Sequence, residues 1–179
     1  MQHTTAVQLV QKGIETMGGI WADLGAGSGT FTRALATIIG PKGLIYAIDK
    51  TREVLDIGGK RADIEADVGS ARVQPIQADF TKRLELANLD GILMANSLHY
   101  VSGQEYFLKD LLLRLKPQGK FLLVEYDKTI ANPWVPYPLS YKAFQELAPL
   151  VGLTEPKMIG RIASHYQTQD IYAAVSTKI

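Results

Sequence analysis

The chain has 179 residues, of which 46% are hydrophobic and 21% are charged, and its 19 basic and 18 acidic side chains leave a formal net charge of +1. A chain of this length buries roughly 70% of the surface that it exposes when unfolded, so residues 1–179 are expected to form one globular domain. Because it contains no cysteine, disulfide bonds, thiolate metal sites and cysteine nucleophiles are excluded. The near-neutral charge disfavours duplex nucleic acid as the default partner.

The first residues do not have the pattern of a targeting signal. Lys12 and Glu15 interrupt the apolar residues before Gly19, so this segment is neither a secretory signal nor a membrane span, and a cytoplasmic location is expected. Ala6–Met17 has helical spacing and precedes the first expected strand. Residues 1–18 are therefore expected to form an N-terminal helix that is free to act as a lid over the ligand-binding edge.

Short runs rich in Ile, Val and Leu alternate with longer segments of helical spacing, which indicates an α/β fold with a parallel sheet. The expected parallel strands are Gly19–Leu24, Gly43–Ile48, Val73–Gln77, Leu89–Ala95 and Lys120–Glu125. The expected helices after the first strand are Phe31–Ile39, Arg52–Ala66, Gln104–Leu115 and Leu139–Val151. Gly40-Pro41 and Pro117-Gln118-Gly119 supply helix stop signals.

The last part of the chain departs from this alternation. Met158–Ala163 and Asp170–Ser176 are two more expected strands, and the short connection between them includes Ser164, Tyr166 and Thr168. A hairpin at this position would place one antiparallel strand in the sheet.

Residues 21–30, with the sequence WADLGAGSGT, lead from an apolar run through three glycines directly into a helical segment. Glycine permits a tight turn and lets a ligand approach the backbone closely. About 20 residues further on, Asp49 closes the second expected strand, where a carboxylate in such sheets accepts hydrogen bonds from ribose hydroxyls. The pattern indicates a nucleoside-bearing ligand. The alternative is that the three glycines only make a tight connection between the strand and the helix.

Two details distinguish this turn from a dinucleotide site. The spacing is G-x-G-x-G, whereas dinucleotide sites have G-x-G-x-x-G. Asp23 also stands at the end of the strand, where its carboxylate would repel a pyrophosphate and could pair with an ammonium or a sulfonium. A cationic nucleoside ligand is favoured.

The segment Asp23–Gly29 closely resembles the first motif of the Rossmann-like, class I S-adenosylmethionine-dependent methyltransferases, and the chain resembles their small single-domain members of the type 11 kind. Residues 77–80, 89–100 and 115–124 resemble later motifs of this family, with Gln118 in place of the first glycine of its L-K-P-G-G turn. The resemblance implies a Rossmann-like, seven-stranded, mostly parallel sheet flanked by helices, with one antiparallel strand from a C-terminal hairpin. It also implies S-adenosyl-L-methionine as cofactor and S-adenosyl-L-homocysteine as product.

The resemblance implies a role for each residue of the cofactor site. Asp49 is expected to hold the ribose, Asp79 and Phe80 the adenine, and Asp23 the cofactor's charge, directly or through water. At Asn96 the family uses the backbone carbonyl, which would leave the side chain incidental, and Lys50 either packs its stem on the adenine or is a solvated side chain. The full expected set is Asp23, Gly25, Ala26, Gly27, Gly29, Thr30, Asp49, Lys50, Asp79, Phe80 and Asn96.

His99 and Tyr100 directly follow the fourth expected strand and are the candidate catalytic residues. An oxygen or carbon acceptor must lose a proton, for which histidine is a suitable base, whereas an amine acceptor needs only desolvation and a free lone pair. The alternative is that both residues cap the next helix or pack beneath the N-terminal helix. The three histidines have no metal-ligand spacing, so no metal is expected.

Residues 132–141 combine three prolines with several aromatic side chains. The corresponding connection in methyltransferases of this fold commonly faces the acceptor, so Trp134, Tyr137 and Tyr141 are expected to form an aromatic wall for a planar or apolar substrate. The alternative is that these rings seal the core.

The acceptor is expected to be a small molecule, because the sheet and its helices leave no sizeable inserted domain for a macromolecule. The chain also lacks the N/D-P-P-Y/F/W motif of the amino-methylating nucleic-acid and glutamine enzymes, and has Asn96-Ser97-Leu98-His99 in its place. RNA methylation is the alternative enzymatic function, since RNA can be bound by stacking and a local basic patch. A noncatalytic cofactor-binding module is the alternative outside enzymes.

Overall fold

The computed structural model describes residues 1–51, 70–164 and 169–179. In this part of the chain, one seven-stranded sheet has the order β3-β2-β1-β4-β5-β7-β6. Five adjacent strands, from β3 to β5, pair in parallel, and β7 is antiparallel to both of its neighbours. The predicted mostly parallel sheet with one antiparallel strand is confirmed. The strands are β1 Gly19–Leu24, β2 Gly43–Asp49, β3 Arg72–Gln77, β4 Leu89–Ala95, β5 Leu115–Tyr126, β6 Lys157–Ile162 and β7 Ile171–Thr177.

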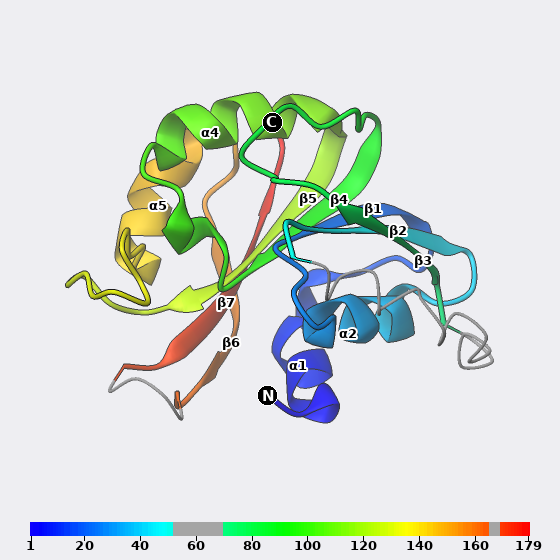
Figure 1. Cartoon of the computed structure of the whole chain (residues 1–179), viewed down its shortest axis with the longest axis horizontal. Helices are drawn as coiled ribbons and strands as arrows, with labels where there is room; N and C mark the ends of the chain where they lie inside the picture. Colours follow the sequence, from blue (N-terminus) through cyan, green and yellow to red (C-terminus); the bar gives the residue numbers. More distant parts are fainter. Residues whose placement is uncertain (52–69, 165–168) are drawn as a thin grey trace.

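Helices cover both faces of the sheet (Figure 1). The described helices are α1 His3–Val10, α2 Thr30–Ile39, α4 Gln104–Leu111 and α5 Tyr141–Leu150, with short 3-10 turns η1 Gln11–Gly13, η2 Leu98–Tyr100 and η3 Leu112–Arg114. Figure 1 shows α1 and α2 together on one face and α4 and α5 on the opposite face. The predicted helix Arg52–Ala66 and most of the predicted hairpin connection lie outside the described residues.

The central strands are buried on both faces because their side chains alternate between two cores. In β5, Phe121 and Leu123 belong to the core under α4 and α5, whereas Leu122 and Val124 belong to the core under α1 and α2. This alternation explains why these strands have unbroken apolar sequences.

The boundary between α4 and β5 differs from the prediction. The helix expected over Gln104–Leu115 ends at Leu111, and Leu115 already pairs with Leu89 of β4. Residues 117–119, predicted to stop a helix, lie inside β5, where Gln118 has φ 63°. Glycine adopts this left-handed conformation more readily than glutamine, and the methyltransferase family that the chain resembles has glycine at this position.

The N-terminal helix is shorter than Ala6–Met17, since α1 ends at Val10 and η1 ends at Gly13. Its buried residues include Leu9, and α1 packs against α2 and β6 on one face of the sheet. The lid role of residues 1–18 stays a prediction.

Candidate functional site

The glycine-rich turn between β1 and α2 lies at the carboxyl ends of the parallel strands. The backbone N–H groups of Gly25 and Ala26 both donate to the carbonyl of Ile48, at 2.8 and 3.0 Å, which ties the turn to β2. Gly25 has φ 83°, and a Cβ there would lie 2.4 Å from Cβ of Ser97. Packing therefore requires glycine at this position.

The surroundings of Gly27 are open. Gly27 has φ 50°, and no described atom lies within 4 Å of the position that its Cβ would take. Its N–H donates to Oδ2 of Asp49 over 2.9 Å. The glycine-rich turn continues through Gly29, the N-cap of α2 at φ 82°, into Thr30, the first helical residue. The open side of Gly27 offers a ligand direct access to the backbone.

Asp49, the last residue of β2, is held by three protein donors. In addition to Gly27, its Oδ1 accepts from the backbone N–H of Thr51 at 2.9 Å and from the Thr51 hydroxyl at 3.0 Å. These bonds fix the orientation of the carboxylate and leave acceptor capacity for ligand hydroxyls, because two carboxylate oxygens offer about four lone-pair sites. Lys50 beside it is exposed.

Asp23, near the end of β1, is 1% exposed. Its Oδ2 accepts from the Thr32 hydroxyl of α2 at 2.6 Å, while Oδ1 is buried and has no hydrogen-bond partner in the described part of the chain. The pKa of Asp23 is raised to about 7, chiefly by burial, against the lowering effect of the Thr32 hydrogen bond and with a smaller upward contribution from the negative charge of Asp49. A positively charged ligand group would provide the partner that Oδ1 of this carboxylate lacks.

Asn96 follows β4 and supplies a second unpaired oxygen. Its backbone has φ 52°, and its N–H donates to the carbonyl of Val124 at 2.8 Å. The side-chain Oδ1 is buried and, like Oδ1 of Asp23, has no partner among the described residues. Buried polar atoms are nearly always hydrogen-bonded, so these two acceptors fit a ligand that carries N–H donors and positive charge.

Asp79 and Phe80 follow β3. Both bonds from Thr81, the hydroxyl at 2.6 Å and the backbone N–H at 2.9 Å, go to Oδ1 of Asp79, and they lower the pKa of this exposed carboxyl. The Phe80 ring lies edge-on to Phe107, with centroids 6.0 Å apart. Its Cε1 would also lie 3.5 Å from a Cβ on Gly25, so Phe80 borders the glycine-rich turn.

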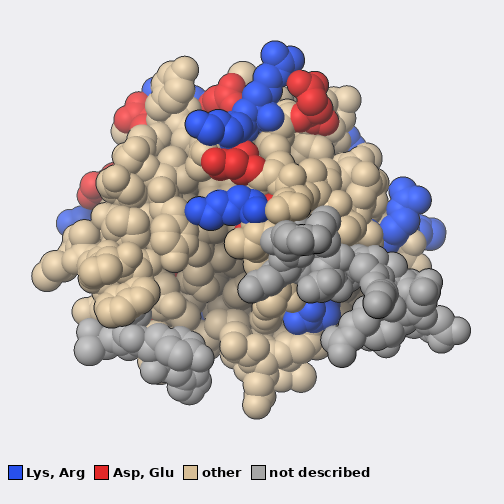
Figure 2. Space-filling model, viewed as in Figure 1, with Lys and Arg blue, Asp and Glu red and all other residues tan. Residues whose placement is uncertain are grey.

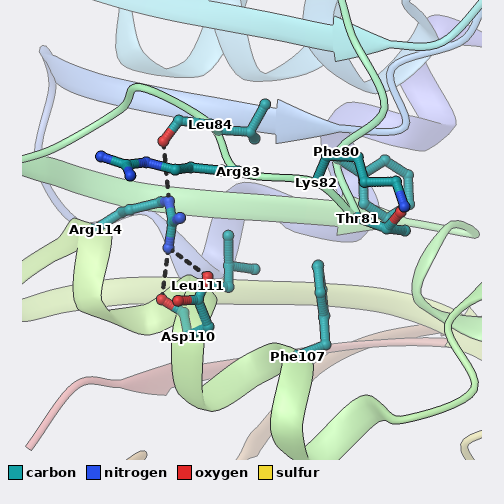
Figure 3. A pocket seen from close by; sticks show the side chains of 9 residues that line it. All are labelled: Phe80, Thr81, Lys82, Arg83, Leu84, Phe107, Asp110, Leu111 and Arg114. Atoms are coloured by element: carbon teal, nitrogen blue, oxygen red, sulfur yellow. Dashed lines mark hydrogen bonds and ion pairs between the residues drawn. The ribbon is translucent and has the colours of Figure 1, made fainter.

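A cavity of about 330 Å³ opens beside Phe80, between the β3–β4 connection and α4. Figure 3 shows the Arg114 side chain between this connection and Asp110. Its Nε donates to the Leu84 carbonyl at 3.4 Å, and its Nη1 pairs with Asp110 at 2.9 Å. These bonds hold the wall of the cavity beside Phe80.

His99 and Glu125 form a buried pair that the sequence interpretation did not include. Nδ1 of His99 lies 2.6 Å from Oε2 of Glu125, and the His99 backbone N–H donates to Oε1 at 3.2 Å. The side chains are 2% and 1% exposed. The His99 ring lies 4.3 Å from that of Tyr100 and 6.0 Å from that of Tyr126. The sequence does contain one signal for Glu125: it is a charged residue at the end of an expected apolar strand.

Two of the three predicted aromatic wall residues are exposed. Trp134 is 70% and Tyr137 is 44% exposed, and the Tyr137 N–H donates to the His99 carbonyl at 3.0 Å. Tyr141 has a different environment, since its hydroxyl donates to the Pro156 carbonyl at 2.8 Å and its ring centroid lies 5.5 Å from that of Tyr172. The structure thus brings Tyr137 to His99 and engages Tyr141 in packing.

Within the described ranges, no group of three or more His, Cys, Asp or Glu side chains could hold a metal ion. None of the helices in these ranges is long and apolar enough to cross a membrane.

The sheet order, the glycine-rich turn and the acidic residue that ends β2 define an α/β domain built to bind a nucleoside-bearing cofactor. Residues 18–173 match the family model described as a methyltransferase domain, and the chain belongs to this family. Its motifs place it in class I, whose methyl donor is S-adenosylmethionine. The predicted class and cofactor are confirmed.

A curated relative, the ubiquinone/menaquinone biosynthesis C-methyltransferase UbiE of Ectopseudomonas mendocina, is 34% identical over 112 residues. The match covers 62% of this chain and 43% of the relative, so the chain spans less than half the length of that protein. Two solved structures are also similar.

The first is the 1,6-didemethyltoxoflavin-N1-methyltransferase of Burkholderia thailandensis, solved with S-adenosylhomocysteine, with a TM-score of 0.73 and 18% identity over 98% of this chain and 77% of the other. The second is the [4+2]-cyclase SpnF, with a TM-score of 0.76 and 13% identity over 98% of this chain and 81% of the other. At these identities the structures show the shared fold alone.

Proposed function

We propose that this chain transfers a methyl group from S-adenosylmethionine to a small-molecule acceptor. Two observations carry the proposal: the buried oxygens on Asp23 and Asn96 that have no partner among the described residues, and the open space at Gly27 in the turn that follows β1. S-adenosylmethionine has a positively charged sulfur and an ammonium group, and its bound sulfonium supplies the activated methyl group. The unpaired oxygens suit both the charge and the N–H donors.

Each remaining part of the cofactor has a candidate partner. Asp49 is proposed to accept hydrogen bonds from the ribose hydroxyls, because Gly27 and Thr51 already fix its carboxylate. Asp79 and Phe80 are proposed to hold the adenine, next to the glycine-rich turn. The chain's task is then to align the acceptor with the methyl group and to exclude water.

A small acceptor agrees with the charge distribution. On the face shown in Figure 2, basic and acidic side chains alternate near the top of the view. Ion pairs in the described part of the chain include Arg83–Glu85, Lys109–Glu105 and Arg114–Asp110. On this face, the described residues form no extended basic surface of the kind that RNA backbones contact. The curated relative named above is a biosynthetic C-methyltransferase by its name, which also favours a small acceptor. A cytoplasmic location is proposed with this function.

Calorimetric titration with S-adenosylmethionine tests the cofactor site. The wild-type protein is expected to bind, and Asp49→Ala is expected to weaken binding by about 10-fold or more, because a hydrogen bond to a charged acceptor contributes about 1.5–3 kcal/mol. Glu146→Ala removes an exposed carboxylate from α5 and serves as the matched control, with unchanged affinity. Equal affinity of Asp49→Ala and the wild type contradicts the ribose assignment.

A further inference from the structure

The buried pair of Glu125 and His99 fixes which ring nitrogen of the histidine carries a proton. Both carboxylate oxygens face N–H groups of His99, since Oε1 accepts from the backbone and Oε2 lies 2.6 Å from Nδ1. An ionised carboxylate only accepts hydrogen bonds, so Nδ1 must be the donor. In the neutral ring, Nε2 therefore keeps its lone pair, and this atom has no hydrogen-bond partner among the described residues.

The pair lies beside the proposed cofactor site. The Asn96 N–H donates to Val124, which directly precedes Glu125, so the ends of β4 and β5 are joined at this point. The Ser97 hydroxyl donates to the Leu24 carbonyl at 2.6 Å, which fixes the start of η2 next to the glycine-rich turn. The unpaired oxygen of Asn96 and the imidazole of His99 thus stand on one short segment.

Two exposed aromatic residues, Tyr100 and Tyr137, contact His99. Tyr100 is 58% exposed and Tyr137 is 44% exposed, and the first lies in ring contact with His99 while the second bonds to its carbonyl. Gln104 donates to the Tyr137 carbonyl at 2.9 Å and so fixes the loop at this point. Exposed aromatic faces beside a base suit a planar ring with a polar substituent.

On the basis of the proposed function, we propose that Glu125 positions His99 as a general base and that the acceptor is an aromatic compound with a ring hydroxyl. The hydroxyl proton passes to Nε2 of His99 while the oxygen forms its bond to the methyl carbon. The carbon–sulfur bond breaks, and its electron pair goes to sulfur. The products are an aryl methyl ether and S-adenosylhomocysteine, and His99 then releases the proton to solvent.

Glu125→Gln tests the positioning role with little change of volume. The His99 backbone N–H can only donate, so it must face the amide oxygen of the new side chain. The amide NH₂ then faces Nδ1, which has to become an acceptor, and the ring proton moves to Nε2. A histidine in this tautomer cannot take a proton from an acceptor at Nε2.

Nitrogen-15 NMR of the imidazole rings reads the tautomer without any acceptor. The chain has three histidines, and His99→Gln assigns the signal. The wild type is expected to show the Nδ1–H form of His99 and Glu125→Gln the Nε2–H form, with S-adenosylmethionine affinity unchanged by calorimetry. An Nε2–H signal in the wild type overturns the positioning role.

Methyl transfer to phenol and to 4-nitrophenol at pH 8 tests the base and the acceptor class together. Phenol must lose its proton, whereas 4-nitrophenol is largely ionised at this pH and needs no base. Glu125→Gln is expected to lose phenol methylation by about 100-fold or more and to keep transfer to 4-nitrophenol, because general bases contribute at least that factor. His99→Gln is expected to show the same selective loss, and Glu146→Gln is the control with wild-type rates.

Several outcomes overturn the proposal. Equal loss on both phenols, or no loss on either, removes the general-base role of the pair. Methylation of aniline without methylation of either phenol excludes the hydroxyl acceptor, and so does a protein that binds S-adenosylmethionine but methylates neither phenol. A wild type that fails to bind S-adenosylmethionine contradicts the proposed function itself, which keeps the two failures distinguishable.

Discussion

The carboxyl group of Asp23 is in an unfavourable environment for a charged group, because it is buried and one of its oxygens has no hydrogen-bond partner among the described residues. Its folded-state pKa of about 7 lies above the ordinary value of 3.8. The protonated Asp23 therefore contributes to the free energy of unfolding. This contribution is fully present below the pKa that Asp23 has in the unfolded chain, and it is lost as the pH rises through about 7. A site that awaits a cationic ligand explains why such a residue is tolerated.

Asp23→Asn is expected to remove this pH dependence, since the amide cannot ionise and its oxygen can still accept from Thr32. Relative to the variant, the wild type should lose about 2 kcal/mol of unfolding free energy between pH 5 and pH 8. Urea unfolding of both proteins across this range measures the difference. Parallel stability curves for the two proteins would show that Asp23 does not titrate between these pH values.

At the scale of elements, the β1–turn–α2 unit uses its glycines for two different purposes. Gly25 is required by packing against Ser97, whereas Gly27 faces open space. Gly25→Ala is expected to destabilise the fold by about 3 kcal/mol, from the left-handed backbone and the steric clash together. Gly27→Ala should cost only about 1–2 kcal/mol, but it should lower S-adenosylmethionine affinity about tenfold or more.

Thermal unfolding and calorimetry of the two variants separate these roles. Gly27→Ala serves as the backbone control for Gly25→Ala, since both residues have positive φ. Full cofactor affinity in Gly27→Ala would mean that the ligand does not approach the turn at this point.

How far the sequence predicts the site depends on how local each signal is. The glycine-rich turn and Asp49 could be predicted, because an apolar run, three glycines and a carboxylate at a strand end are adjacent or regularly spaced signals. The pair of His99 and Glu125 could not, since no sequence pattern connects a histidine after β4 with a carboxylate near the end of β5. They meet only because β4 and β5 are neighbours in the sheet.

The wrong boundary predicted between α4 and β5 also results from contacts between residues that are distant in the sequence. Leu115 is the last residue of the helix expected over Gln104–Leu115, but its pairing with Leu89 makes it the first residue of β5. Tertiary hydrogen bonds here outweigh local helical propensity.

At the scale of the whole molecule, the sheet order brings the ends of β1, β2, β4 and β5 to one edge, where the unpaired oxygens and the buried acid–base pair lie together. Ligands of open α/β sheets bind at this edge, outside the carboxyl ends of the strands.

The most direct test is transfer of a labelled methyl group from S-adenosylmethionine into a fractionated bacterial extract by the purified protein. Label is expected in the small-molecule fraction with the wild type, and strongly reduced label is expected with Asp49→Ala at the same S-adenosylmethionine concentration. Label confined to the RNA fraction, or no label from a protein that binds S-adenosylmethionine, would contradict the proposed function.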